Sequence, residues 1–314
     1  MPNSSDFDTS EYPILSLKHA TETVAPPRVA VEFAAATHAG LVRTENEDHF
    51  LVARLSRSLH TMLTNVPTKD VPNHADAHGY VMAVADGLGG HTAGGLASRL
   101  AIHTGLELIL SASNWALRPD AHEATRLMNR LKEYFVEIDR AFQRELGARP
   151  DLAGMATTLT VAYTVGLQTF LVHVGDSRLY CYRDGTLEQL TRDHTVAQAL
   201  ADSGLISGDE LRRHPKRHVL TNVISGHPGD VRPDVATHTL TYGDLLLLCT
   251  DGLHDLIQDP DLAAILDRHP APQEACDALV AAALHRGGRD NVTVIIAKYV
   301  EVKTDEARVG LTPN

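Results

Sequence analysis

Acidic side chains at the ends of apolar segments are the residues of this sequence that could carry chemistry. Asp86 and Asp251 each follow an apolar run, "YVMAVA" and "DLLLLCT", and Asp48 and Asp290 each precede one, "HFLVARL" and "NVTVIIAKYV". A single acid in such a place is commonly a turn residue or a helix cap. In an antiparallel pair, however, the end of one strand lies beside the start of its neighbour. The four acids can therefore gather at one edge of a sheet.

Carboxylates that gather in this way need cations beside them. Unmatched carboxylates repel and raise one another's pKa values, and oxygen ligands suit Mg²⁺ or Mn²⁺. Gly87 and Gly252 directly follow two of the acids, and glycine allows both a sharp turn and the close approach of a backbone carbonyl to an ion. The pattern predicts a metal centre.

The elements that would position these acids form an α+β arrangement. Apolar alternation and turn residues predict strands at 31–40, 48–55, 80–85, a meander over 156–191, and strands at 235–240, 244–250 and 291–300. Helical spacing predicts helices at 93–110, 123–146, 260–270 and 273–288. Strands joined by tight turns, with helices in pairs between strand groups, predict antiparallel sheets with helices packed outside.

Four segments interrupt this pattern. Residues 1–30 are predicted to be a flexible N-terminal extension, and residues 301–314 a C-terminal tail. Residues 56–79 are polar and contain His and Pro, so we expect an insertion loop. Residues 194–227 are irregular and partly helical, and we expect a flap that covers the site and shapes substrate choice.

Composition narrows the function. The chain has 314 residues and a formal net charge of -12, so it shows neither the basic footprint of a nucleic-acid binder nor the basic face of a peripheral membrane protein. Its N-terminus has early acids and no apolar signal core, which favours the cytoplasm. Cys181, Cys249 and Cys276 are widely spaced, which is typical of reduced thiols. We expect a monomer.

Six motifs, taken in order, resemble one family. They are "GLVRTENED" (40–48), "VADGLGGHTAG" (84–94), "DLAGMATTLT" (151–160), "VGDSRLYCYRDG" (174–185), "CTDGLHD" (249–255) and "GGRDNVTV" (287–294). Their order and spacing resemble the metal-dependent protein serine/threonine phosphatases, the PP2C-like (PPM) family, and bacterial members most closely. The resemblance covers residues 31–300. It implies a four-layer α-β-β-α sandwich, two antiparallel sheets flanked by helices.

The resemblance also implies roles for the acids. Asp86 would bridge two Mn²⁺ or Mg²⁺ ions and the Gly87 carbonyl would hold one of them, while Asp251 and Asp290 would complete the shell of the other. Glu47 and Asp48 would hold metal-bound waters. A hydroxide that bridges the two ions would attack phosphorus directly, with no phosphoenzyme intermediate.

Two further residues enter through the same resemblance. Arg43 opens the "RTENED" stretch, and its planar guanidinium suits a bidentate grip on phosphate oxygens, although a surface arginine is the common alternative. Asp151 matches the position that helps to hold a third, weaker ion together with Asp251; a solvated loop acid is its alternative. Asp176, in "VGDSR", is expected to be a structural, turn-capping residue.

One position departs from the family pattern. Leu88 stands where eukaryotic relatives have a histidine that is a candidate general acid. Protonation of the leaving group would then fall to a metal-bound water or to His91.

Other site types fit less well. His74 and His78 are four residues apart but lie in a Pro- and Gly-flanked stretch, which disfavours a zinc site. The stretch "GLGGHTAGG" fails the glycine pattern of nucleotide loops, because Thr92 stands at its sixth position.

The function expected from these residues is hydrolysis of phosphoserine and phosphothreonine in proteins, with phosphoproteins as partners, including a Ser/Thr kinase or its substrates. The alternative is a catalytically weak PP2C-fold regulatory or sensor protein, which should have lost Asp86, Asp251 or Asp290. A two-metal nuclease would need a basic surface for nucleic acid, and the net charge opposes it.

Overall fold

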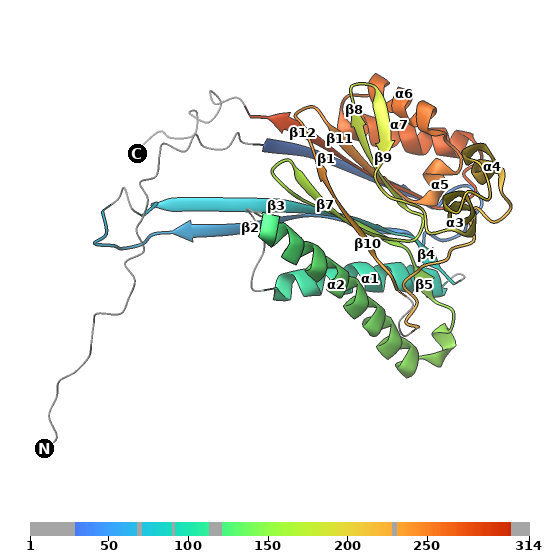
Figure 1. The fold of residues 1–314 in the computed structure, drawn as a ribbon, viewed down its shortest axis with the longest axis horizontal. Coiled ribbons are helices and arrows are strands. Elements are labelled where there is room, and N and C mark those ends of the chain that lie inside the picture. Colours follow the sequence, from blue (N-terminus) through green and yellow to red (C-terminus); the bar gives the residue numbers. More distant parts are fainter. Residues whose placement is uncertain (1–28, 68–70, 90–91, 113–120, 228–230, 303–314) are drawn as a thin grey trace, which may run out of the picture.

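The fold is a sandwich of two sheets with helices on both outer faces (Figure 1). The computed structural model describes residues 29–67, 71–89, 92–112, 121–227 and 231–302. The predicted α-β-β-α sandwich is confirmed. Most of the predicted N-terminal extension and C-terminal tail lie outside the described residues.

Each sheet has five antiparallel strands. The first has the order β1 (Val29–His38), β12 (Val292–Glu301), β11 (Leu245–Cys249), β8 (Arg178–Arg183) and β9 (Thr186–Gln189). The second has the order β10 (Asp234–Thr239), β7 (Gln168–Val174), β6 (Leu159–Val165), β3 (His74–Ala85) and β2 (His49–His60). A short pair, β4 (Gly87–Leu88) with β5 (Ala156–Thr157), continues from the end of β3.

The helices divide between the two outer faces. The long helices α1 (Thr92–Ser111) and α2 (Ala121–Ala148) cover the second sheet, and α6 (Asp259–Arg268) and α7 (Pro272–His285) cover the first (Figure 1). Short helices complete the chain: η1 (Pro150–Leu152), α3 (Val196–Asp202), α4 (Gly208–Arg213) and α5 (Asp251–His254).

Strand β11 explains why some strands carry no polar residue. Leu246 and Leu248 pack between the two sheets, whereas Leu245, Leu247 and Cys249 point the other way, into the core beneath α6 and α7. Successive side chains of a strand face opposite sides, so a strand that is covered on both faces must be apolar at every position. The apolar run of β11 ends shortly before Asp251, the first charged residue after the strand.

The hairpin of β2 and β3 is longer than predicted. The strands pair from His49 opposite Ala85 out to His60 opposite His74, so the prediction of a loop over residues 56–79 is wrong and only residues 61–73 connect the strands. The pairing of β3 with β6 covers only Tyr80–Val84. The outer half of the hairpin is thus a two-stranded ribbon without a core, and its polar residues give no buried-strand signal.

The flap segment, residues 194–227, contains α3 and α4 and is otherwise irregular. A bridge between Thr195 and Leu220 joins its two sides, and a second bridge joins Ile224 to Thr157. Asp139 of α2 is buried and accepts hydrogen bonds from the backbone N–H groups of Ser225 and Gly226, at 3.2 and 2.7 Å. The C-terminal end of the flap segment is therefore fixed on α2.

The three cysteines are buried and form no disulfide. Burial raises the pKa of each thiol above its ordinary value. They behave as core residues, as the sequence predicted. Among the described residues, no helix combines the length and apolarity needed to cross a bilayer.

Candidate metal centre

Asp86 lies where β3 ends, and its backbone is fixed from β5 and the residue after it. Its N–H donates to Thr158 Oγ1 at 3.0 Å, and its carbonyl accepts from the Thr158 N–H at 3.0 Å and the Thr157 hydroxyl at 2.7 Å. Burial raises the pKa of the Asp86 carboxyl well above its usual range, and the charges of Asp251 and Asp48 raise it further. A rigid backbone thus holds an acid among other acids.

Gly87 is enclosed so closely that no other residue fits. A Cβ at this position would collide with the backbone of Gly94 in α1 and lie 2.8 Å from the carbonyl oxygen of Glu47. A Cβ on Gly94 would in turn lie 2.8 Å from the Glu47 carboxyl carbon. The two glycines therefore bring the first turn of α1, the Asp86–Gly87 turn and Glu47 together.

Asp48 begins β2 and lies inside the protein, with 6% of its surface exposed. Its Oδ2 accepts a hydrogen bond from the Thr250 hydroxyl at 2.8 Å, but its buried Oδ1 has no hydrogen-bond partner. Burial raises the pKa of Asp48 to about 7, against the hydrogen bonds of Thr293 and Thr250, and the charges of Asp290 and Glu47 add to the rise. A buried acceptor without a donor is costly unless a cation or water completes it.

Asp251 opens α5 immediately after β11. Gly252 packs so tightly against the Asn291 carbonyl that a Cβ there would overlap it, which seats the turn against the start of β12. Burial raises the pKa of Asp251 well above its usual range, and the charges of Asp176 and Asp255 come next. The ends of β3 and β11 and the starts of β2 and β12 therefore meet at one end of the sandwich. The acids converge as predicted, but they come from both sheets and not from the edge of a single one.

Asp290 lies at the rim of this edge and pairs with Arg43. The Arg43 Nη2 is 2.7 Å from Asp290 Oδ2, with side chains that are 55% and 39% exposed. The hydrogen bond and charge of Asp290 raise the pKa of Arg43, and Glu47 and Asp251 also contribute. Arg43 therefore faces the acids.

Asn291 ties the two segments of the rim together. Its Oδ1 accepts from the Glu47 N–H at 2.8 Å, and its Nδ2 donates to the carbonyls of Ala39 and Glu45, each at 2.9 Å. Gly40, with φ +83°, makes the turn that this packing requires, because a Cβ there would collide with the Asp290 carbonyl. The sequence analysis did not identify the role of Asn291.

Three further residues join the acids without having been predicted as ligands. The flap residue His218 lies with its Nδ1 2.9 Å from Asp255 Oδ2, and one ligand atom each of His218, Asp255 and Asp251 lie within 4.8 Å of one another. Asp176 is buried, and burial raises its pKa to about 7, with the charges of Asp193 and Asp255 next in effect. The "GLHD" motif contained Asp255, but only the folded chain brings His218 to it.

The geometry does not group Asp151 with these acids. Its carboxylate is 70% exposed and its Oδ2 lies 3.4 Å from Arg149 Nη2. Leu88 lies in β4, and His91, the second candidate for leaving-group protonation, falls outside the described residues.

The residues present fit divalent cations. Asp48, Asp86, Asp251 and Asp290 offer oxygen donors, Gly87 has no side chain of its own to shield its carbonyl, and the Asp48 Oδ1 has no donor. Buried carboxylates that raise one another's pKa values are stable as anions only with positive charge beside them. Hard oxygen donors suit Mg²⁺ and Mn²⁺.

Comparisons with known proteins agree with this geometry. A family model described as "Protein phosphatase 2C" matches residues 64–286. The serine/threonine protein phosphatase PstP of Mycobacterium tuberculosis is 34% identical over 274 residues, covering 87% of this chain and 46% of that protein. The chain thus spans about half the length of that relative. The serine/threonine phosphatase stp of Listeria welshimeri is 32% identical over 218 residues, covering 69% of this chain and 84% of its own length.

Solved structures show the same fold. The crystal structure of the M. tuberculosis PstP/Ppp phosphatase superimposes with a TM-score of 0.69 at 33% identity, covering 87% of this chain and 99% of that one. A PstP catalytic domain in complex with two manganese ions gives a TM-score of 0.68 at 32% identity, covering 87% and 100%.

Proposed function

This chain belongs to the protein phosphatase 2C family, and we propose that it hydrolyses phosphoserine and phosphothreonine in proteins at a centre of two Mn²⁺ or Mg²⁺ ions. The observation that carries the proposal is the convergence of the buried Asp48 with the partly buried Asp86 and Asp251, whose pKa values are all raised. A chain that had become only a scaffold would have no reason to keep this unfavourable arrangement. The manganese-bound PstP domain supports the choice of ion.

Each acid has a role in the proposal. Asp86 would hold both ions and the Gly87 carbonyl one of them, Asp251 and Asp290 would complete the set, and Glu47 and Asp48 would hold waters. When bound, two divalent ions supply an activated water as nucleophile and neutralise charge on the phosphate. The unpartnered Oδ1 of Asp48 is available to accept a proton or a hydrogen bond from such a water.

Arg43 would bind the substrate phosphate. Its guanidinium is held at the rim by Asp290, and more than half of its side chain is exposed, so its remaining N–H groups face the position from which a substrate approaches. A bidentate contact with two phosphate oxygens would orient phosphorus towards the acids.

We also propose a third, weaker ion beside Asp251. Asp151 was the predicted second ligand, and its exposure and its contact with Arg149 do not support that role strongly. Asp255 and His218, whose donor atoms lie within 4.8 Å of Asp251 and of each other, support a site on the flap side instead.

The biological setting follows from the same proposal. The protein would act as a monomer in the cytoplasm on phosphoproteins, including a Ser/Thr kinase or the substrates of that kinase. The flap, residues 194–227, would contribute to the choice among them.

The test compares hydrolysis of a phosphothreonine peptide with added Mn²⁺ and with chelator, for the wild type and Asp251→Asn. We expect chelator to abolish turnover and the variant to lose about 100-fold or more in kcat, because the ions supply the nucleophile. Calorimetric titration with Mn²⁺ should show weakened or lost binding in the variant, independently of activity.

The matched control is Asp277→Asn, an exposed acid on α7 that is bonded to Gln273. It should bind Mn²⁺ and turn over peptide as the wild type does. Full activity of the wild type in chelator would overturn the proposed function.

A further inference from the structure

The flap carries positive charge that the acid centre does not use. Arg212, Arg213, Lys216 and Arg217 occur within six residues of a chain whose net charge is -12, and all four are exposed. We call these four residues the basic ridge. Such a local excess of one sign, on a protein of the opposite sign, is a feature of surfaces that meet charged ligands.

The cations of the ridge are poorly neutralised. Arg212 lies 3.7 Å from Asp209 on the same helix, but both side chains are largely exposed, so this pair contributes little. For Arg213, Lys216 and Arg217 the structure shows no ion pair with any residue in its described ranges. The ridge thus presents at least three cations to solvent.

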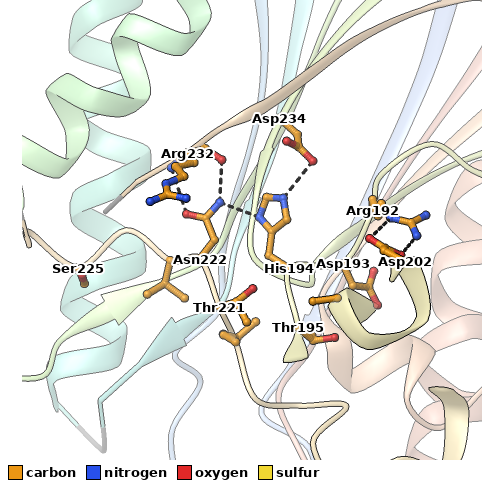
Figure 2. A pocket seen from close by; sticks show the side chains of 13 residues that line it. Arg192, Asp193, His194, Thr195, Asp202, Thr221, Asn222, Ser225, Arg232 and Asp234 are labelled. Carbon is orange, nitrogen blue, oxygen red and sulfur yellow. Dashed lines mark hydrogen bonds and ion pairs between the residues drawn. The ribbon is translucent and has the colours of Figure 1, made fainter. Parts of the chain in front are cut away.

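The inner side of the flap is different. There a polar cavity of about 600 Å³ opens between the flap and the start of β10, and Figure 2 shows two pairs among its charged side chains. Arg192 pairs with Asp202, and His194 pairs with Asp234 at 3.1 Å while it contacts Asn222. The unneutralised charge is therefore a property of the ridge and not of the whole flap.

The ridge leads directly to the acid centre. His218, the residue after Arg217, contacts Asp255 at 2.9 Å, and Asp255 lies beside Asp251. The ridge and the acid centre are thus joined through one flap residue, His218.

Backbone contacts fix the ridge in this position. The Val196 N–H donates to the Val219 carbonyl and the Thr221 N–H to the His194 carbonyl, each at 2.8 Å. The Arg217 N–H donates to the His214 carbonyl at 3.1 Å, which closes the turn that carries Lys216 and Arg217. The cations are thus presented on a defined turn.

We propose that the basic ridge binds a second phosphate group on the same substrate, so that the enzyme prefers phosphoproteins with two neighbouring phosphoresidues. This inference rests on the proposed phosphatase function. A dianionic phosphate offers several acceptor oxygens to two or three cations at once, which a single carboxylate does not match. An extended peptide advances about 3.3–3.6 Å per residue, so a second phosphoresidue two to four positions from the hydrolysed one lies about 7–14 Å along the substrate.

The experiment measures kcat/KM in Mn²⁺ for matched peptides that carry one phosphothreonine, the same phosphothreonine with a second phosphoserine two to four positions away, or an Asp or a Lys in place of that phosphoserine. The proteins are the wild type, Arg213→Gln/Lys216→Gln/Arg217→Gln, and the same triple change to Glu. We expect the wild type to favour the doubly phosphorylated peptide about 10-fold over the singly phosphorylated one, and the Gln variant to reduce this ratio to about one.

The Glu variant separates binding from damage. It should reverse the selectivity and favour the Lys-bearing peptide, a gain that a misfolded flap could not produce. The matched control is Arg126→Gln/Lys132→Gln/Arg144→Gln, which removes three exposed cations from α2 and should keep the wild-type ratio. Hydrolysis of p-nitrophenyl phosphate by every variant reports on the acid centre alone.

Two outcomes overturn the inference while leaving the proposed function intact. Equal kcat/KM of the wild type on singly and doubly phosphorylated peptides would show that the ridge does not read a second phosphate. An equal loss on all peptides in the Gln variant would assign the ridge to general electrostatic attraction. If the wild type hydrolyses no phosphopeptide in Mn²⁺, the proposed function itself fails.

Discussion

Two groups of charged residues meet at Asp176, and they differ in whether the chain supplies a cation for their carboxylates. In the first group, Asp193 receives three hydrogen bonds from Arg178, at 2.6 to 3.2 Å, and both side chains are largely buried. Burial alone would raise the pKa of Asp193, but the hydrogen bonds and charge of Arg178 outweigh it and the pKa is lowered. In the second group, Asp86 and Asp251 have no such partner and their pKa values are raised.

The difference indicates which carboxylates are structural and which await a ligand. Where the chain supplies its own guanidinium, folding neutralises the carboxylate charge. The resulting ion pair holds β8 to the segment before the flap. Where the chain supplies only acids and glycines, the ionised carboxylates destabilise the folded protein until cations bind beside them. Burial acts to raise the carboxylate pKa values in both groups, so burial alone does not distinguish them.

The largest expected effect breaks the first group. Arg178→Met should leave Asp193 buried without its cation and lower the free energy of unfolding by about 3–5 kcal/mol, measured by chemical denaturation in Mn²⁺. The double variant Arg178→Met/Asp193→Leu should recover most of this loss, because removing both charges avoids the isolated anion. A single variant as stable as the wild type would mean that Asp193 is solvated.

The second prediction concerns the pH dependence of the metal-free protein. Burial raises the pKa of Asp48 and of Asp176 to about 7 in the folded state, while unfolded aspartate titrates near 4. Between pH 4 and 7 the folded state thus binds more protons than the unfolded state. The contribution of each group to the free energy of unfolding should therefore fall as pH rises through this window, by up to about 1.4 kcal/mol per pH unit.

Denaturant titrations in chelator, between pH 5 and 8, measure this slope. Saturating Mn²⁺ should flatten it at the upper end and add about 2–3 kcal/mol at 100 times the dissociation constant. Asp193 has the opposite effect on the pH dependence of stability. Its lowered pKa stabilises the folded protein, and this stability is lost only as pH falls below the ordinary aspartate range. Stability that rises with pH between 5 and 7 in chelator would contradict the uncompensated acid centre.

The smallest expected change in the free energy of unfolding also distinguishes the two groups most directly. In chelator at pH 8, Asp86→Asn should raise the free energy of unfolding by about 1 kcal/mol, because it removes one of several repelling carboxylates. Asp193→Asn should lower it by about 1–3 kcal/mol, since it weakens the hydrogen bonds with Arg178. Thermal melts of the two variants, recorded side by side, should shift in opposite directions; a shift of the same sign would remove the distinction drawn above.

Local signals, the apolar strands and the residues that end them, predicted antiparallel sheets with outer helices and the meeting of the strand-end acids, whereas the four-layer sandwich was implied by the family resemblance. Asp86, Asp251 and Asp48 could be identified in this way, each as the charged residue beside an apolar run. The sequence placed Arg43 and Asp290 in two motifs that were expected at the same site. It did not predict that the two side chains pair.

Other features depend on contacts that the sequence does not contain. The outer β2–β3 ribbon pairs with no third strand, so its side chains carry no buried-strand pattern, and the sequence predicts a loop over residues 56–79. His218 reaches Asp255 only because the flap folds back between its bridges at Thr195 and Thr157. Asp151 occupies a motif position, yet its side chain turns to solvent and Arg149.

The burial of all three thiols has a practical meaning for this protein. Cys181, Cys249 and Cys276 lie in or beneath the first sheet with raised pKa values, and such thiols react slowly with peroxide and alkylating reagents. Oxidative stress should therefore not inactivate the protein through its thiols. A single cysteine introduced on the flap would accept a fluorescent or spin label alone, so that movement of the flap could be followed in the otherwise native chain.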